Sequence, residues 1–303
     1  MAFGGNLKNR QVKTIRSIPE MQSFSSEKAK LNTKVALVPT MGALHQGHLT
    51  LIELARKKVG PQGVVIVSIY VNPTQFGPSE DFDQYPRDFD SDHQKCVQAG
   101  VDLIFAPLDS DMYPGKSSGN YSTYVEEKSL GRTMEGESRP THFRGVTTIV
   151  AKLFLACLPH VSVFGQKDFQ QVAIIKQMVK DLNFPVEILV SPTYRESDGL
   201  AMSSRNKYLT PLQRRQAPVI NTLLNEVCVR VRESHKNGKK INQADLKAFA
   251  EKYIVLQSEA RLDYICGFDP NTLEPAKTLN IGHQVAIAVH FGEVRLIDNI
   301  CIR

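Results

Sequence analysis

The sequence has no tryptophan, no long apolar run and few cysteines, and each scarcity excludes a class of protein. No stretch approaches the about 18 consecutive apolar residues of a membrane-spanning helix, and the first thirty residues contain no apolar core of signal-peptide length. We therefore expect no membrane span and no export. The five cysteines are scattered, odd in number and free of CxxC spacing, so neither a disulfide framework nor a zinc site is indicated, and a cytoplasmic location is expected.

The composition that remains is that of an ordinary globular protein. Of 303 residues, 42% are hydrophobic and 22% are charged, which argues against a disordered chain. The net charge is +6, but the lysines and arginines are interspersed with 31 acidic residues instead of forming long blocks. This distribution favours a small anionic substrate over a nucleic-acid partner.

Short β-branched runs alternate with longer segments of helical periodicity from Val35 onward, which predicts βαβ units. Because the short runs are apolar throughout, we expect a parallel, doubly wound, Rossmann-like α/β sheet that is covered on both faces. The expected strands are 35–39, 64–71, 101–107, 161–165 and 186–192. The expected helices are LTLIELARKKV, FDSDHQKCVQAG, VTTIVAKLFLACL and QVAIIKQMVKDL.

The sequence changes in character near residue 193, where a polar, turn-rich segment begins. Two helical stretches follow, near 211–234 and 243–257. Two strands, 284–291 and 294–302, are then expected to form a hairpin around Gly292 and Glu293. We therefore expect a first domain over 1–193 and a smaller α+β C-terminal domain over 194–303.

The stretch MGALHQGH, residues 41–48, lies between the first predicted strand and the first predicted helix. In an open α/β sheet this strand-to-helix turn lies at the carboxyl edge, where ligands bind. The start of a helix offers unpaired N–H groups and a partial positive charge, both of which attract phosphate. Gly42 and Gly47 remove side chains that would keep a ligand from the backbone.

His45 and His48 are three residues apart, so both can reach an oxygen held at the first helical turn. Imidazole supplies a directional hydrogen-bond donor, and a cation when it is protonated. Metal binding is the rival interpretation, but two ligands alone rarely make a site and no third is evident nearby.

Two short motifs give this chain a recognisable resemblance. HQGH resembles the HxGH signature of the nucleotidyltransferase superfamily, and MSSRN (202–206) resembles its second, phosphate-binding signature. The segments VPTMGALHQGH, VNPTQFGPSEDFDQYPRD, RPTHFRGV, VFGQKDFQQV and RESDGLAMSSRN are similar to those of the pantothenate synthetase (pantoate–β-alanine ligase) family. Together with LIDNICI near the end, they cover nearly the whole chain.

The resemblance implies a two-step reaction in which ATP is a substrate. The family joins (R)-pantoate to β-alanine through a pantoyl adenylate, releasing pyrophosphate and then AMP, and so makes pantothenate. It further implies a homodimer, no nucleic-acid or membrane partner, and an ATP- and pantoate-binding first domain followed by a C-terminal lid. Because a carboxylate attacks the α-phosphate, the site must neutralise and align two negative groups.

The resemblance also carries site residues onto this sequence. His45, His48 and Lys167 are expected to be catalytic, with the histidines donating to phosphate oxygens and the lysine placing a cation against them. Asn72, Gln75 and Gln171 match the pantoate-binding positions, and Gln75 is also expected to meet β-alanine. The expected ATP-binding residues are Met41, Gly42, Ala43, Leu44, His45, Gln46, Gly47, His48, Gly165, Gln166, Lys167, Asp168, Tyr194, Met202, Ser203, Ser204 and Arg205.

Two positions depart from the family pattern, and one acidic run leaves its role open. Tyr194 stands where the family has a small aliphatic residue, and Gln166 replaces the more frequent glutamate of GEKD. The run SEDFDQYPRDFDSD (79–92) could help to hold Mg²⁺, or Asp88 or Asp90 could cap a helix. We expect Mg²⁺ to bind mainly through the ATP phosphates and water, and we assign no protein ligand to it.

Two other functions compete with this interpretation. A different HxGH nucleotidyltransferase would transfer a nucleotide to a phosphorylated acceptor, but the amide-rich VNPTQF and the lack of an extra cationic site argue against it. A non-catalytic RNA-binding protein would show a clustered basic face with aromatic stacking positions, and this sequence shows neither.

Overall fold

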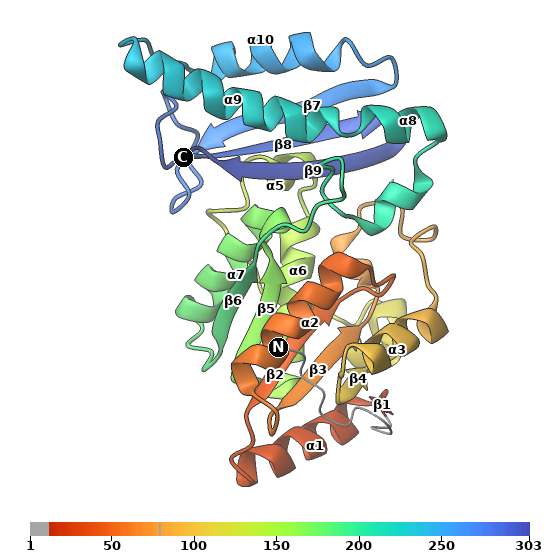
Figure 1. Ribbon diagram of the computed structural model, residues 1–303. Coiled ribbons are helices and arrows are strands. Elements are labelled where there is room, and N and C mark those ends of the chain that lie inside the picture. Colours follow the sequence, from red (N-terminus) through yellow and green to blue (C-terminus); the bar gives the residue numbers. More distant parts are fainter. Residues whose placement is uncertain (1–11, 79) are drawn as a thin grey trace. The chain divides into compact units, whose positions relative to one another are not determined.

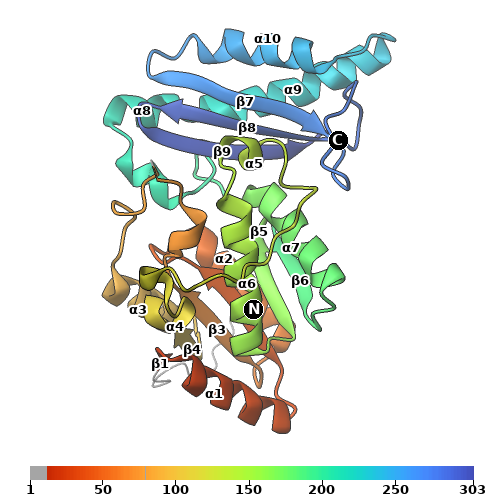
Figure 2. The same ribbon diagram turned by 180° about the vertical axis from the view of Figure 1, so that it is seen from behind.

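The computed structural model describes residues 12–78 and 80–303, and the chain divides into two compact units. Of the described residues, the first unit holds those between 12 and 127 together with Thr141–Gly165 and Ile174–Ser191. The second holds Lys128–Pro140, Gln166–Ala173 and Pro192–Arg303. Figures 1 and 2 show the elements of both units from opposite sides. The division into domains at residues 193 and 194 stays a prediction.

The first unit is built on a six-stranded sheet in the order β1-β4-β3-β2-β5-β6, in which every neighbouring pair is parallel. β2 and β3 are almost wholly buried, as their continuous apolar sequences require of central strands covered on both faces. The strands are β1 (Lys13–Ile15), β2 (Val35–Thr40), β3 (Val64–Ile69), β4 (Leu103–Phe105), β5 (Val161–Gly165) and β6 (Glu187–Ser191). The predicted parallel, doubly wound sheet is confirmed.

Helices cover both faces of this sheet. Leu51, Ile52 and Ala55 of α2 and Cys96 of α3 pack with strand residues into one apolar cluster, so these two helices share a face. α1 and α6 contact each other on the opposite face (Figure 2). The helices are α1 (Ile18–Lys30), α2 (Gln46–Val59), α3 (Phe89–Gln98), α4 (Asp109–Met112), α6 (His142–Cys157) and α7 (Phe169–Asp181), of which the first turn of α7 belongs to the second unit.

The order of the strands places a switch point between β2 and β5. From β2 the chain proceeds outward to β3 and β4, and it then returns through α6 to add β5 and β6 on the other side of β2. Ligands of open α/β sheets bind outside the carboxyl ends of the strands at such a point. β2 ends at Thr40, immediately before the MGALHQGH stretch.

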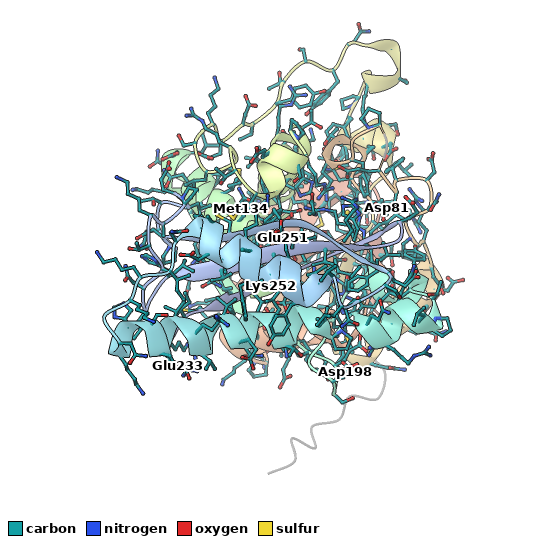
Figure 3. All side chains as sticks on the ribbon, turned by 90° about the horizontal axis from the view of Figure 1, so that it is seen from above. Asp81, Met134, Asp198, Glu233, Glu251 and Lys252 are labelled. Carbon is teal, nitrogen blue, oxygen red and sulfur yellow. The ribbon has the colours of Figure 1, made fainter. Side chains whose placement is uncertain are left out.

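The second unit is built on the antiparallel sheet β7-β8-β9. Alternate residues of the hairpin, such as Val285, Ile287 and Val289 of β8, pack with Leu223 of α9 and Leu246 of α10. The outward faces of these two helices are charged, as the exposed Glu233, Glu251 and Lys252 show in Figure 3. The elements are α5 (Glu135–Ser138), α8 (Pro211–Gln216), α9 (Val219–Lys236), α10 (Gln243–Ile254), β7 (Ala260–Phe268), β8 (Gln284–Phe291) and β9 (Val294–Cys301).

A buried ion network ties α5 to the other face of this sheet. Arg295 of β9 makes two hydrogen bonds to Glu135, at 2.8 and 2.7 Å, and also donates to Asp263 of β7. The Tyr264 hydroxyl donates to Glu135 at 3.0 Å. Burial alone would raise the pKa of Glu135, but the Arg295 guanidinium holds that pKa below its ordinary value. Residues 128–140 belong to the second unit through this network.

The structure corrects several details of the predicted elements. The helical stretch expected near 211–234 is two helices, because Pro218 at the start of α9 lacks the N–H that would continue α8. The short edge strand β1, the helix α1 and the strand β7 were not predicted. Among the helices of the described ranges, none combines the length and the apolarity that spanning a membrane needs.

Candidate active site

The stretch that follows β2 is a turn with two left-handed residues. Gly42 has a φ of 82° and Ala43 a φ of 50°, a region that favours glycine. The turn begins with the hydroxyl of Thr40, which accepts from the Gly42 N–H at 3.2 Å and donates to the Ser68 carbonyl at 2.6 Å. The turn is therefore fixed to the end of β3 as well as to β2.

Asp92 of α3 holds the middle of this turn. Its side chain is 2% exposed, and its two oxygens each accept at 2.7 Å, one from the Ala43 N–H and the other from the Leu44 N–H. A Cβ on Gly42 would lie 2.8 Å from the Asp92 Oδ2. Burial raises the pKa of Asp92, whereas the two backbone donors lower it. Two of the amides expected to face a nucleotide are therefore engaged by this carboxylate.

His45 precedes the first residue of α2, and His48 lies in its first turn, so the helix begins three residues earlier than the predicted LTLIELARKKV. The His45 N–H donates to the Nδ1 of His48 at 3.2 Å. A nitrogen that accepts cannot carry the proton, so neutral His48 has its N–H at Nε2. The two rings lie with centroids 4.1 Å apart. The structure thus brings the two predicted histidines together.

A buried amide network lies beyond the carboxyl end of β3. Asn72 is 1% exposed, and its amide donates to the Gln75 side-chain oxygen at 2.9 Å and to the Gly145 carbonyl at 3.2 Å. Its oxygen accepts from the Tyr113 hydroxyl at 2.6 Å and from the Thr74 hydroxyl at 2.9 Å. Burial raises the pKa of Tyr113, so this phenol stays protonated and donates. Asn72 therefore orients the side-chain amide of Gln75 by donating to its oxygen.

Gln75 closes the short helix η1 (Pro73–Gln75) and connects this network to the turn after β2. The Nε2 of its side chain lies 3.2 Å from the sulfur of Met41, and its main-chain carbonyl oxygen lies 2.9 Å from the Nδ1 of His142. Gly145 of α6 permits this packing, since a Cβ there would lie 2.4 Å from the Thr74 carbonyl. In the first unit the structure thus gathers Met41, the histidine pair, Asn72 and Gln75.

The predicted lysine lies in the second unit, in the short helix η3 (Gln166–Asp168). Its Nζ is 3.5 Å from the Asp168 carboxylate, and its side chain is 20% exposed. The two glutamines that follow have different surroundings. Gln170 is buried and donates to the carbonyls of Leu130 and Thr133, both at 2.8 Å, whereas Gln171 is half-buried. Gln170 therefore holds the main chain at Leu130 and Thr133. The contact of Gln171 with pantoate stays a prediction.

The second predicted signature follows a small, tightly held loop. The main chain of Arg195 forms an isolated antiparallel β-bridge with that of Ala201, and the Arg195 guanidinium donates to Asp298 at 2.6 and 3.0 Å. The Tyr194 carbonyl accepts from the Met202 N–H at 3.0 Å, while the Tyr194 ring is exposed. Ser203 caps the short helix η4 (Ser204–Tyr208). Met202, Ser203, Ser204 and Arg205 are all half-buried.

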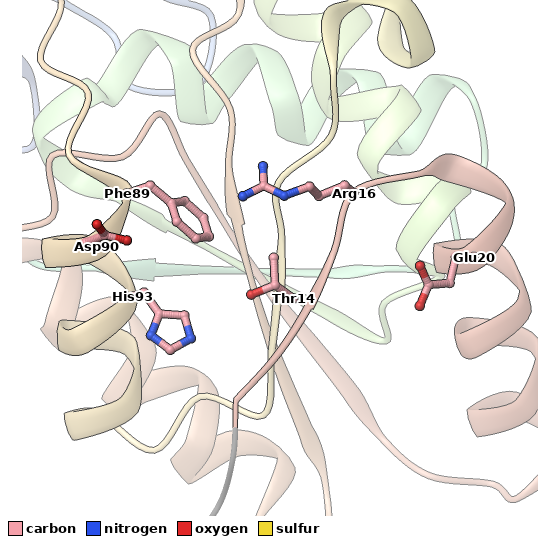
Figure 4. Close-up of a pocket in the computed structure, with 6 residues that line it drawn as sticks. All are labelled: Thr14, Arg16, Glu20, Phe89, Asp90 and His93. Atoms are coloured by element: carbon pink, nitrogen blue, oxygen red, sulfur yellow. The ribbon is translucent and has the colours of Figure 1, made fainter.

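A separate hollow lies on the first unit, at β1 and the start of α3 (Figure 4). Arg16 stacks 4.8 Å from the Phe89 ring centroid, and His93, Glu20 and Asp90 line the same hollow. The lining thus includes two basic side chains and two carboxylates, so it favours neither an anionic nor a cationic ligand. None of the predicted site residues lines it.

Two residues of the acidic run, Asp88 and Asp92, have structural roles. Asp88 caps α3 by accepting from the Ser91 N–H at 3.0 Å, which confirms one of the two roles left open for the run. Within the residues that the structure describes, no group of three or more histidine, cysteine, aspartate or glutamate side chains could hold a metal ion.

Several residues of the site were not singled out from the sequence. Asp92 and Tyr113 act through side-chain contacts with residues far away in the chain, and no local pattern announces such contacts. His142 and Gly145 fall in RPTHFRGV, so that motif carried a signal for them without showing what they contact. Asn299, whose amide donates to the Gln166 and Lys167 carbonyls, falls in LIDNICI in the same way.

Comparison with known proteins gives one consistent family. A family model described as pantoate-beta-alanine ligase matches residues 13–301. The pantothenate synthetase of Moorella thermoacetica is 44% identical over 288 residues, covering 95% of this chain and 98% of that protein. The pantothenate synthetase of Geotalea daltonii is 46% identical over 285 residues, covering 94% and 97%.

Solved structures agree with the sequence relatives. The crystal structure of pantothenate synthetase from Thermus thermophilus matches with a TM-score of 0.84 and 41% identity, covering 96% of this chain and 99% of that one. A pantoate-β-alanine ligase from Francisella tularensis, complexed with β-γ ATP and β-alanine, matches with a TM-score of 0.77 and 34% identity, covering 96% and 98%.

Proposed function

The chain belongs to the pantoate–β-alanine ligase family, and from that premise we propose which of its residues perform each part of the reaction. The enzyme condenses (R)-pantoate with β-alanine at the expense of ATP. The pantoate carboxylate first attacks the α-phosphorus and pyrophosphate leaves. The β-alanine nitrogen then attacks the acyl carbon, loses a proton and displaces AMP, which leaves pantothenate.

The histidine pair is the observation that carries the assignment of the first step. Two imidazoles 4.1 Å apart follow the carboxyl end of a central strand, and the main chain fixes the proton of His48 at Nε2. A neutral imidazole of this tautomer donates to a phosphate oxygen where charge develops in the transition state. We assign Met41–His48 to the nucleotide, with His45 and His48 as phosphate donors. The Ala43 and Leu44 amides hold Asp92, so other atoms of this turn would contact ATP.

Gln75 is proposed to bind pantoate. Its amide is oriented by Asn72 and lies beside Met41, in the same unit as the histidines. An uncharged amide binds hydroxyl and carboxylate oxygens without trapping the nucleophile in a tight ion pair. Asn72 is 1% exposed, so its proposed contribution is to hold Gln75 in place. Gln75 is also proposed to meet β-alanine in the second step.

Two motif residues are proposed to supply the cations. Lys167 and Arg205 would neutralise phosphate charge, and the hydroxyls of Ser203 and Ser204 would donate to phosphate oxygens. Gly165 ends β5 without a side chain, so it and Gln166, Asp168, Tyr194 and Met202 are proposed to line the nucleotide. Gln171 is proposed to contact pantoate. These assignments rest on the position of each residue within its motif and on the half-buried state of the two cationic side chains.

Three finer features are also proposals. Mg²⁺ would arrive bound to the ATP phosphates and water, since the described residues offer no cluster of three metal-binding side chains. When bound, the ion would neutralise phosphate charge. A homodimer is expected from the family. A cytoplasmic location is expected from the absence of paired cysteine motifs.

Substitution of Gln75 tests the pantoate assignment. Gln75→Ala is expected to raise the KM for pantoate by about 10-fold or more, because it removes a hydrogen-bonding group from that substrate. The KM for ATP should change by less than about 2-fold. Gln94→Ala, at an exposed position of α3, is the matched control. A pantoate KM that stays normal in Gln75→Ala would remove this residue from the pantoate site.

A further inference from the structure

The last strand of the chain carries two polar side chains, next to each other, that are both buried. Asp298 is 3% exposed and Asn299 is 5% exposed. Successive residues of a strand point to opposite faces of the sheet, so the two side chains serve different neighbours. Asp298 holds Arg195, as described above. Asn299 reaches the loop that carries Lys167.

The side chain of Asn299 makes three hydrogen bonds of good length. Its Nδ2 donates to the Gln166 carbonyl at 3.0 Å and to the Lys167 carbonyl at 2.8 Å. Its Oδ1 accepts from the Nε2 of Gln284, on the neighbouring strand, at 2.7 Å. The reverse orientation of the Asn299 amide would set its oxygen against two carbonyl oxygens, so the network determines which way the amide faces.

We infer that Asn299 is a positioning residue for Lys167. This inference rests on the phosphate-binding role proposed above for Lys167. A lysine side chain is long and flexible, so the place of its ammonium group is first limited by the place of its backbone. Asn299 fixes that backbone on both sides of the Lys167 Cα, through the carbonyls of Gln166 and Lys167.

Lys167 should matter for the first step of the reaction and not for the second. The charge of the phosphates must be neutralised while the pantoate carboxylate attacks the α-phosphorus and pyrophosphate departs. The attack of β-alanine on the acyl carbon takes place after pyrophosphate has left. Misplacement of Lys167 should therefore slow the first step and spare the second.

The experiment compares Asn299→Asp with the wild-type enzyme in each step separately. Pantoate-dependent pyrophosphate release in a single turnover reports the first step, and AMP release from synthetic pantoyl adenylate and β-alanine reports the second. Asn299→Asp replaces two donors by a carboxylate facing two carbonyls, and the first step is expected to slow on the order of 100-fold. The second step should change by less than about 2-fold. Asn225→Asp, on the exposed face of α9, is the control.

Two further variants keep the test decisive. Asn299→Ser retains one donor and is the milder change if Asn299→Asp does not fold, with an intermediate rate expected for its first step. The double variant Asn299→Ser with Lys167→Ala should be no slower in the first step than Lys167→Ala alone, because the lysine to be placed is gone.

Contrary outcomes distinguish the inference from its premise. Equal slowing of both steps by Asn299→Ser, or full additivity with Lys167→Ala, would show a general structural role and overturn the inference. A slow Lys167→Ala beside a normal Asn299→Asp would overturn the inference and leave the role of Lys167 intact. A normal first step in Lys167→Ala would overturn that role, and the inference with it.

Discussion

His48 contacts the main chain through one ring nitrogen, and the other is proposed to serve the reaction. Its Nδ1 accepts from the His45 N–H in the first turn of α2, which leaves Nε2 as the proton-bearing atom. The spacing of the two histidines and their position after an apolar run predicted the pair. The tautomer could not be predicted, because it depends on a single backbone hydrogen bond.

His48→Asn tests the structural role and the proposed catalytic role of this side chain separately. The asparagine oxygen can replace Nδ1 as acceptor of the His45 N–H, but no group of asparagine reaches as far as Nε2. We expect an unchanged melting temperature and adenylate formation slowed on the order of 100-fold or more. Thermal unfolding and pantoate-dependent pyrophosphate release measure the two effects. A near-normal rate of pyrophosphate release would remove His48 from the chemistry.

The contact of Asp92 with the turn after β2 could not be predicted from a sequence motif. It lies 49 residues after Ala43 and 48 after Leu44, yet it bonds both amides in the turn. The acidic run around it suggested a metal ligand or a helix cap, and Asp88 is the residue that caps the helix. Contacts between segments so far apart in the chain have no local pattern, so Asp92 was not predicted to hold the turn.

Asp92→Asn is expected to loosen the turn before α2. The amide can accept one of the two N–H groups and presents its own N–H₂ to the other, so one buried donor loses its partner. We expect a loss of about 1–3 kcal/mol in the free energy of unfolding, measured in urea, and a higher KM for ATP. Asp90→Asn, on the exposed side of α3, is the control. Equal ATP affinity in Asp92→Asn and the wild type would contradict this role.

At the scale of elements, strands and helices with strong periodicity were predicted well. Continuous apolar runs identified β2 to β6. In β2 to β5 this reflects burial on both faces, whereas β6 is a half-buried edge strand. β7 was not predicted, because a bulge between Leu262 and Tyr264 interrupts its alternation. β1 is only three residues long and lies at the sheet edge, so its sequence KTI carries little signal.

The packing of α6 against the turn at Thr74 and Gln75 depends on Gly145. Alanine is the better helix former, but its Cβ would lie 2.4 Å from the Thr74 carbonyl oxygen. We expect Gly145→Ala to cost about 1–3 kcal/mol of stability and to raise the KM for pantoate through displacement of Gln75. Urea unfolding and steady-state kinetics measure these effects. Leu155→Ala, at an exposed position of α6, is the control, and a pantoate KM equal in both variants would contradict the prediction.

The ion pair between Arg295 and Glu135 in the second unit can be tested by substitution. Arg295→Met removes both hydrogen bonds of the Arg295 guanidinium to the buried Glu135 and leaves only Arg139, at 3.9 Å, as its ion-pair partner among the described residues. The change is expected to cost about 3 kcal/mol at neutral pH. Since the Glu135 pKa is lowered on folding, its ionised form stabilises the folded unit above the ordinary value of 4.5, and that contribution is lost as the pH falls through the lowered pKa.

The difference between Arg295→Met and the wild type should therefore shrink below pH 4.5. Urea unfolding at a series of pH values measures this difference. Arg261→Met, which changes an exposed arginine on β7, should show no such pH dependence. A constant difference across the acidic range would contradict the assigned pairing of Arg295 with Glu135.

At the scale of the whole molecule, the family resemblance identified the reaction and the order of elements gave the fold. The grouping of 128–140 and 166–173 with the second unit was not predicted. Both segments are held there by side chains from β9, namely Arg295 and Asn299. Such contacts join residues more than 100 positions apart, which local composition and periodicity do not report.

The measurement that tests the central claim most directly follows pyrophosphate and AMP separately. The purified protein is incubated with ATP, Mg²⁺ and pantoate, with and without β-alanine. We expect pyrophosphate to depend on pantoate and to form once per enzyme molecule when β-alanine is absent. AMP release should begin only when β-alanine is added. Pyrophosphate release that ignores pantoate, or AMP release that ignores β-alanine, would contradict the two-step reaction assigned to this enzyme.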